Sequence, residues 1–134
     1  MPLAQIDVLE GRPGEELTAI ADSVHEAMVE HLDVPERDRF QIVTQHTEQS
    51  LRFNRHYLDV ERSDRWVMVR ITLSAGRATE AKQAFYGRLA GLLVDRVGLR
   101  GEDLAVMLVE NAREDWSFGH GQASYLELPP EAWR

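Results

Sequence analysis

The arrangement of turns and apolar residues in this 134-residue chain occurs twice, at an offset of 65 positions. Each copy runs from a short apolar stretch through a Gly-Arg turn and a helical periodicity to a second apolar stretch. The offset places Gly11-Arg12 on Gly76-Arg77 and Asp38 on Asp103. This doubled order predicts an α/β fold of the α+β sandwich type: two β-α-β units share one sheet, and both helices cover one face. The alternative is an α/β chain in which the correspondence is coincidental.

The length suits one compact domain, and we interpret the chain as a single domain of two units. Residues 2–46 and 65–110 form the units, residues 47–64 link them, and residues 111–134 form a tail rich in aromatic residues, Gly and Pro. The helix-free face of such a sheet is apolar and needs a cover, which oligomerisation can supply.

In the first unit, the spacing of apolar residues changes from strand to helix and back to strand. Residues 2–9 are apolar and predict a strand. Residues 15–32 carry apolar side chains at the i, i+3, i+4, i+7 spacing of an amphipathic helix. That helix ends before Pro35, because the residue before a proline avoids helical geometry. Residues 39–45 predict the second strand.

The second unit repeats this order with stronger signals. Residues 65–73 are rich in β-branched and aromatic residues and predict a strand. A helix is predicted to follow Thr79 as its N-cap and to run to Val97, with Gly98 as its stop. Residues 104–110 predict the last strand.

The composition excludes several classes of protein. A net charge of −8 argues against nucleic-acid binding, which needs clustered Lys and Arg. No apolar run approaches the roughly 20 residues of a membrane span, and the start of the chain does not resemble a signal peptide. The absence of cysteine excludes disulfides and a thiol nucleophile. We therefore expect a cytoplasmic protein with no membrane partner, in which individual arginines can still bind a small anion.

Pro2 carries a potential catalytic group if Met1 is removed. The secondary amine so exposed has an ordinary pKa of about 7.7–8.0, which apolar walls or nearby cations lower. As a neutral amine it can abstract a proton beside a carbonyl, and as an ammonium it can act as a general acid. A proline in second position does not by itself indicate catalysis.

Further motifs, considered together with Pro2, indicate a protein family. They are Val34–Arg39, Ala75-Gly76-Arg77, Val109-Glu110-Asn111 and, the most specific of them, Trp116-Ser117-Phe118-Gly119. With Pro2 and the doubled unit, they resemble the tautomerase superfamily over nearly the whole chain, and in particular its long-chain branch that includes malonate semialdehyde decarboxylase.

The resemblance implies an enzyme without a cofactor that acts on a small keto or enol carboxylate. It implies Pro2 as the base or acid, Asp38 as its helper and Arg77 as the carboxylate clamp. From the residues alone, a capping or surface salt-bridge role is favoured for Asp38, and Arg77 can cap turn carbonyls. The resemblance also implies a homotrimer.

Four residues are predicted to bind the substrate. Trp116 and Phe118 match positions that wall the proline in similar proteins, and Tyr125 is a weaker candidate for the same wall. Some decarboxylases of the family carry two arginines one residue apart, whereas this chain has only Arg77 in that loop. Arg70, on the preceding strand, is a candidate substitute, although strand alternation does not fix which face it takes. The reaction therefore stays open between tautomerisation and decarboxylation.

No metal site is predicted, because the five histidines lack ligand spacing. We expect His25 and His31 at the surface or an interface, and the charged stretch 59–65 to be a solvated linker. Two other functions remain as alternatives: a non-catalytic trimeric binding module of the same fold, and an unrelated ferredoxin-like binding domain.

Overall fold

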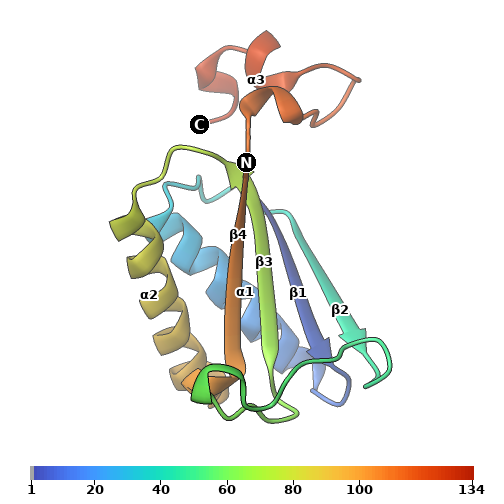
Figure 1. The fold of residues 1–134 in the computed structure, drawn as a ribbon. Coiled ribbons are helices and arrows are strands. Elements are labelled where there is room, and N and C mark those ends of the chain that lie inside the picture. Colours follow the sequence, from blue (N-terminus) through green and yellow to red (C-terminus); the bar gives the residue numbers. More distant parts are fainter. Residues whose placement is uncertain (1) are drawn as a thin grey trace.

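A computed structural model describes residues 2–134, in which a four-stranded mixed sheet is covered on one face by two long helices (Figure 1). The first unit contains β1 (Leu3–Leu9), α1 (Gly14–His31) and β2 (Gln41–His46). The second contains β3 (Val67–Ser74), α2 (Thr79–Val97) and β4 (Leu104–Asn111). This order confirms the two predicted β-α-β units.

The strand order is β2-β1-β3-β4. β1 pairs in parallel with β2, and β3 in parallel with β4, whereas the central pair β1 and β3 is antiparallel. The two units therefore run in opposite directions, and the amino end of β1 lies beside the carboxyl ends of β3 and β4. This arrangement brings Pro2 to the same end of the sheet as the loop after β3.

Equivalent turn residues of the two units have similar backbone conformations. Gly11 and Gly76 have φ angles of 118° and 127°, and Asp33 and Gly98, which follow the two helices, have φ angles of 53° and 63°. Positive φ angles of this kind favour glycine, so their recurrence at an offset of 65 is a structural property of the repeat.

The core lies between the sheet and the helices. Alternate residues of β1 and β3 are buried on this side, as the two-residue period of a strand requires. They pack with the apolar faces of both helices. The core includes Ile6, Val8, Val24, Met28, Val69, Ile71, Phe85, Leu89 and Leu93.

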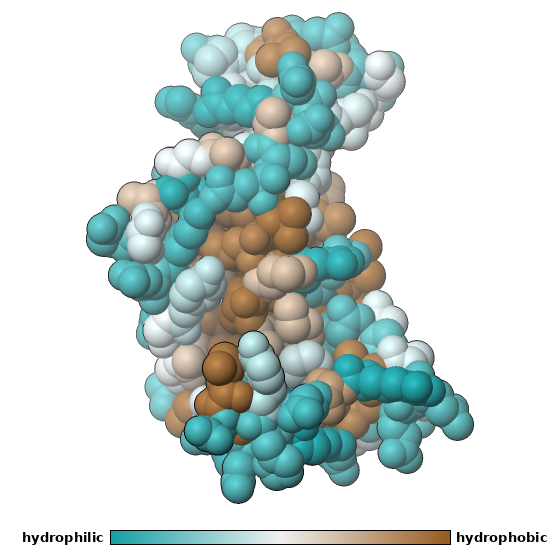
Figure 2. Space-filling model, viewed as in Figure 1, coloured by the Kyte–Doolittle hydropathy of each residue, from teal (hydrophilic) through white to brown (hydrophobic). Residues whose placement is uncertain are grey.

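The opposite face of the sheet has no helix over it. Figure 2 shows an apolar area over the strands on this face. Ile42, Met107 and Val109 are 48%, 43% and 40% exposed. Arg70 also lies on this face, where its guanidinium donates hydrogen bonds of 3.1 and 2.8 Å to Oε1 of Gln5.

Three details of the sequence prediction are corrected. The α2 helix begins at Thr79 with Ala78 as its N-cap, and no side chain caps it, so Thr79 is not the cap. His25 is only 8% exposed, because α1 presents it to the loop before β2, where its Nε2 lies 2.8 Å from the carbonyl oxygen of Glu36. The linker is anchored and not fully solvated, since Ser63 donates its N–H and hydroxyl to the buried carboxylate of Asp103.

The C-terminal tail turns over the end of the sheet where Pro2 lies (Figure 1). It consists of two 3-10 turns, Arg113–Asp115 and Pro130–Ala132, and a short helix α3 (Ser124–Glu127). Neither long helix, nor any other helix in residues 2–134, has the length and apolar character needed to cross a membrane.

Candidate active site

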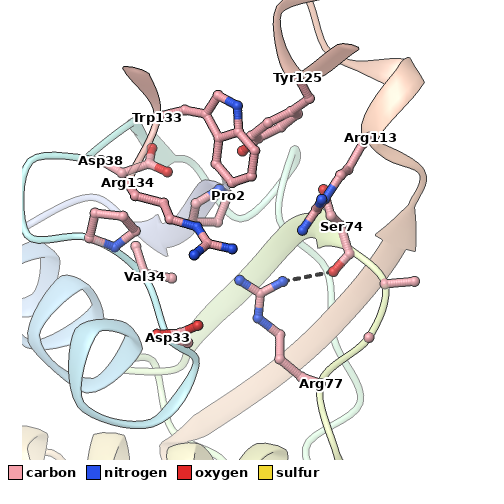
Figure 3. Close-up of a pocket in the computed structure, with 13 residues that line it drawn as sticks. Pro2, Asp33, Val34, Asp38, Ser74, Arg77, Arg113, Tyr125, Trp133 and Arg134 are labelled. Atoms are coloured by element: carbon pink, nitrogen blue, oxygen red, sulfur yellow. Dashed lines mark hydrogen bonds between the residues drawn. The ribbon is translucent and has the colours of Figure 1, made fainter. Parts of the chain in front are cut away.

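A cavity of about 600 Å³ opens at the end of the sheet where Pro2 lies (Figure 3). Three segments build it around Pro2: the loop between α1 and β2, the loop between β3 and α2, and the tail. Its lining is Pro2, Asp33, Val34, Pro35, Asp38, Ser74, Ala75, Gly76, Arg77, Arg113, Tyr125, Trp133 and Arg134.

Pro2 is buried at the start of β1, and it contributes to the cavity wall. Val34, which is 3% exposed, and Pro35 are its apolar companions in the lining. Because Pro2 immediately precedes a central strand, its position is fixed by the sheet and not by a flexible loop. Met1 lies outside the described residues.

Asp38 lies in the tight loop between α1 and β2. Its backbone N–H donates a 2.9 Å hydrogen bond to the carbonyl of Pro35. Burial raises the pKa of the Asp38 carboxyl above its ordinary value, whereas the nearby charges of His25 and Arg77 act in the opposite direction. The loop is held from beneath by Nε2 of His25, which lies 2.8 Å from the carbonyl oxygen of Glu36.

Arg77 joins the two units at the cavity. Its Nε donates a 2.7 Å hydrogen bond to the carbonyl of Leu32, and its Nη1 donates one of 2.7 Å to the carbonyl of Ser74. Burial lowers the pKa of Arg77, while the carboxylates of Asp33 and Asp38 raise it. A guanidinium has five N–H donors, so these two bonds fix its orientation and leave donors for an anion. Arg77 therefore both caps turn carbonyls and faces the cavity.

The aromatic residues of the tail form a continuous series of ring contacts. Centroid distances are 5.7 Å for Trp116–Phe118, 5.1 Å for Phe118–Tyr125 and 5.0 Å for Tyr125–Trp133. Tyr125 and Trp133 line the cavity, whereas Trp116 and Phe118, which were predicted to wall it, are not part of its lining and reach it through the ring contact of Phe118 with Tyr125. The indole N–H of Trp116 donates a 2.9 Å hydrogen bond to Oδ1 of Asn111, which ties the series to the end of β4.

The structure thus brings Pro2, Asp38, Arg77 and Tyr125 to one cavity. Arg70 is on the helix-free face with Gln5 and does not line the cavity.

Sequence reasoning missed three tail residues of the lining: Arg113, Trp133 and Arg134. The guanidinium carbons of Arg113 and Arg134 lie 5.1 and 5.5 Å from the ring centroid of Trp133. The adjacent aromatic and basic residues at 133 and 134 were the only signal of this cluster in the sequence.

The equivalent position at the other end of the sheet has a different environment. There Arg12 donates a hydrogen bond to the backbone carbonyl of Arg65. Asp103, the counterpart of Asp38, is 1% exposed and accepts bonds of 2.6 and 2.7 Å from Ser63 of the linker. The linker thus occupies, at this end of the sheet, the position that the cavity has at the other end. Across residues 2–134, no three His, Asp or Glu side chains are grouped so as to hold a metal ion.

Comparisons with known proteins agree with this fold. Two sequence profiles described as tautomerase enzyme match residues 38–119 and residues 2–58. The probable tautomerase YusQ of Bacillus subtilis (strain 168) is 38% identical over 127 residues, which span 95% of this chain and 100% of YusQ. A crystal structure of malonate semialdehyde decarboxylase superposes with a TM-score of 0.86 at 35% identity, covering 92% of this chain and 95% of that one.

A fused 4-OT symmetric trimer shares the fold, with a TM-score of 0.73 at 20% identity, over 90% of this chain and 94% of that one. The doubled β-α-β sheet and the nearly complete coverage by YusQ lead to the same conclusion: the chain belongs to the tautomerase family of enzymes.

Proposed function

We propose that the protein catalyses keto–enol tautomerisation of a small keto or enol carboxylate, with the amine of Pro2 as general base and acid once Met1 has been removed. The observation that carries this proposal is that Pro2, Asp38 and Arg77, from three separate segments, line one cavity. The family membership supports the class of reaction.

In this mechanism the substrate carboxylate binds the free donors of Arg77 and places the enol beside Pro2. The neutral amine accepts the proton of the enol hydroxyl, and the electron pair of the O–H bond forms the carbonyl. The carbon–carbon double bond takes a proton from the resulting ammonium, which restores the neutral amine. One base can serve both steps because proton transfer needs only a group within hydrogen-bond reach.

The surroundings of Pro2 suit this role. The residue is buried beside Val34 and Pro35, and an apolar environment disfavours the ammonium form of an amine. Asp38 is the helper, and its carboxylate stabilises the ammonium when the amine carries the proton.

Decarboxylation is the second candidate, favoured by the 35% identity to malonate semialdehyde decarboxylase. In that reaction the ammonium of Pro2 would polarise a carbonyl β to the carboxylate. The carbon–carbon bond then breaks to release CO₂, and its electron pair forms the double bond of an enol as the carbonyl oxygen takes the ammonium proton. The enol then takes up a solvent proton at carbon and returns its hydroxyl proton to the amine of Pro2, which gives the product. A non-catalytic binding module is the remaining alternative.

We also propose a homotrimer that covers the helix-free face. The exposed Met107 and Val109 support this, because contiguous apolar surface of this kind marks an interface. The fused 4-OT protein of the same fold is a trimer.

The test is to assay the Met-free protein, verified by intact mass, on phenylenolpyruvate, 2-hydroxymuconate and malonate semialdehyde. We expect Pro2→Ala to reduce turnover about 100- to 10,000-fold, the usual contribution of a positioned acid–base group. Pro13→Ala is the matched control, since Pro13 is exposed and its counterpart in the second unit is already Ala78. Equal turnover by the Pro2 variant and the parent, or no turnover of any of the three compounds, contradicts the proposal.

A further inference from the structure

Two guanidinium groups besides Arg77 face the cavity. Arg113 follows β4, and Arg134 follows the last 3-10 turn of the tail. Figure 3 shows the side chains of Arg77, Arg113 and Arg134 directed toward the same space, with Pro2 beside it.

Two carboxylates of the cavity lining lie close to Arg77. Asp33 and Asp38 both raise the pKa of Arg77, against the effect of burial, whereas the positive charge of Arg113 lowers it. Within residues 2–134, neither Arg113 nor Arg134 forms an ion pair with a carboxylate side chain. A single carboxylate bound to Arg77 therefore leaves the positive charges of Arg113 and Arg134 unneutralised.

Trp133 holds both of these guanidiniums. Their carbons lie 5.1 and 5.5 Å from its ring centroid, within the range of a cation–π interaction. The indole is fixed in turn by the ring of Tyr125, at 5.0 Å and nearly perpendicular. The indole Nε1 is buried and has no hydrogen-bond partner in the described part of the chain. One aromatic ring thus contacts both guanidiniums of this wall.

We propose that Arg113 and Arg134, held on the ring of Trp133, form a second carboxylate subsite, and that the substrate is a dicarboxylate with its other carboxylate on Arg77. This rests on the proposed function for the assignment of Arg77. Guanidinium groups bind carboxylates through paired N–H donors, and two like charges on one wall repel until an anion lies between them. A cavity of about 600 Å³ has room for a chain that joins the two subsites.

The test is a binding measurement that needs no catalysis. trans,trans-Muconate and sorbate share a six-carbon diene skeleton, and sorbate has a methyl group in place of one carboxylate. By isothermal titration calorimetry we expect the parent protein to bind muconate at least about tenfold more tightly than sorbate, the usual value of one charge-assisted pair of hydrogen bonds.

Arg113→Gln and Arg134→Gln should each weaken muconate binding about tenfold and change sorbate binding less than about twofold. Both residues are exposed, so these variants are expected to fold. Arg55→Gln is the matched control: it removes a guanidinium that lies 4.4 Å from the ring of Phe53. Both residues belong to the segment between β2 and β3, which runs along the other end of the sheet (Figure 1). The muconate binding of Arg55→Gln should equal that of the parent.

Equal affinities for muconate and sorbate overturn the subsite, and so do parallel losses for both ligands in the two arginine variants. Inorganic phosphate that binds more tightly than muconate overturns the dicarboxylate assignment. Failure of the proline mechanism is a separate result. It would appear as full turnover by Pro2→Ala, while the discrimination between muconate and sorbate persists.

Discussion

Nε of Arg77 donates a 2.7 Å hydrogen bond to the carbonyl oxygen of Leu32, which ties the loop after β3 to the end of α1. One side chain therefore connects the two β-α-β units at the cavity and orients its remaining donors toward a ligand. Arg77 therefore both stabilises the contact between the units and is available to bind an anion.

Replacing Arg77 is expected to affect both catalysis and stability. Arg77→Gln should lower kcat/KM about 100-fold, as loss of a preorganised donor does. It should also lower the free energy of unfolding by about 1–3 kcal/mol, because the carbonyl of Leu32 loses its partner. Arg12→Gln, in the equivalent turn, is the control for the repeat: denaturant unfolding should show a loss of stability, while steady-state kinetics should not change. A large kinetic loss in the Arg12 variant would contradict the assignment of the site to one end of the sheet.

Asp38 should make stability depend on pH in a defined direction. Burial raises its pKa in the folded state, so the folded protein holds this proton more tightly than the unfolded chain does. Its contribution to stability is therefore greatest below the ordinary aspartate pKa, and it falls as pH rises through the raised value. Asp38→Asn should have a higher Tm than the parent at pH 7 and a turnover lower by about 100-fold. A lower Tm for Asp38→Asn at pH 7 would count against the burial effect.

His25 is expected to act as a positioning residue for Asp38. Its Nε2 lies 2.8 Å from the carbonyl oxygen of Glu36, which requires the proton on Nε2. His25→Ala should cost about 1–3 kcal/mol of stability and lower kcat more than it raises KM. His25→Gln places an N–H near the same point and should recover much of kcat. If both variants lose stability but keep the parent kcat, His25 supports only the fold.

The helix-free face is expected to be the trimer interface. Met107→Asp places a charge at a side chain that is 43% exposed in the single chain, and it should shift the sedimentation coefficient from trimer to monomer. Val94→Asp is the matched control, because Val94 is 49% exposed on α2, on the other side of the sheet. A parent protein that sediments as a stable monomer would contradict the assembly.

The sequence predicted the elements of both units because each has a strong local signal. The carboxyl end of α2 was predicted correctly, and Gly98 ends it with a positive φ angle as expected, whereas its amino end lies one residue earlier than the predicted cap at Thr79 implies. Pro2 and Arg77 were assigned to one site by the resemblance to the tautomerase superfamily, because the repeat alone does not fix that β1 and β3 pair in antiparallel. Arg70 could not be placed, since an alternating strand is consistent with either face until its partners are known.

The tail could not be predicted in the same way. Its helical turns have three or four residues each, too few for a period to appear. Its position depends on side-chain contacts between residues far apart in the tail, such as Tyr125 with Trp133. Arg113, Trp133 and Arg134 therefore became visible as a cluster only in the folded chain.

The central claim is that the amine nitrogen of Pro2, and not its ring, performs the chemistry. The most direct test is to insert one alanine between Met1 and Pro2, which converts that amine to an amide once the methionine is removed and leaves every side chain of the cavity unchanged. We expect kcat/KM on phenylenolpyruvate to fall about 100-fold or more relative to the Met-free parent, with the new amino terminus confirmed by intact mass. Undiminished kcat/KM in the protein with the inserted alanine would contradict the account.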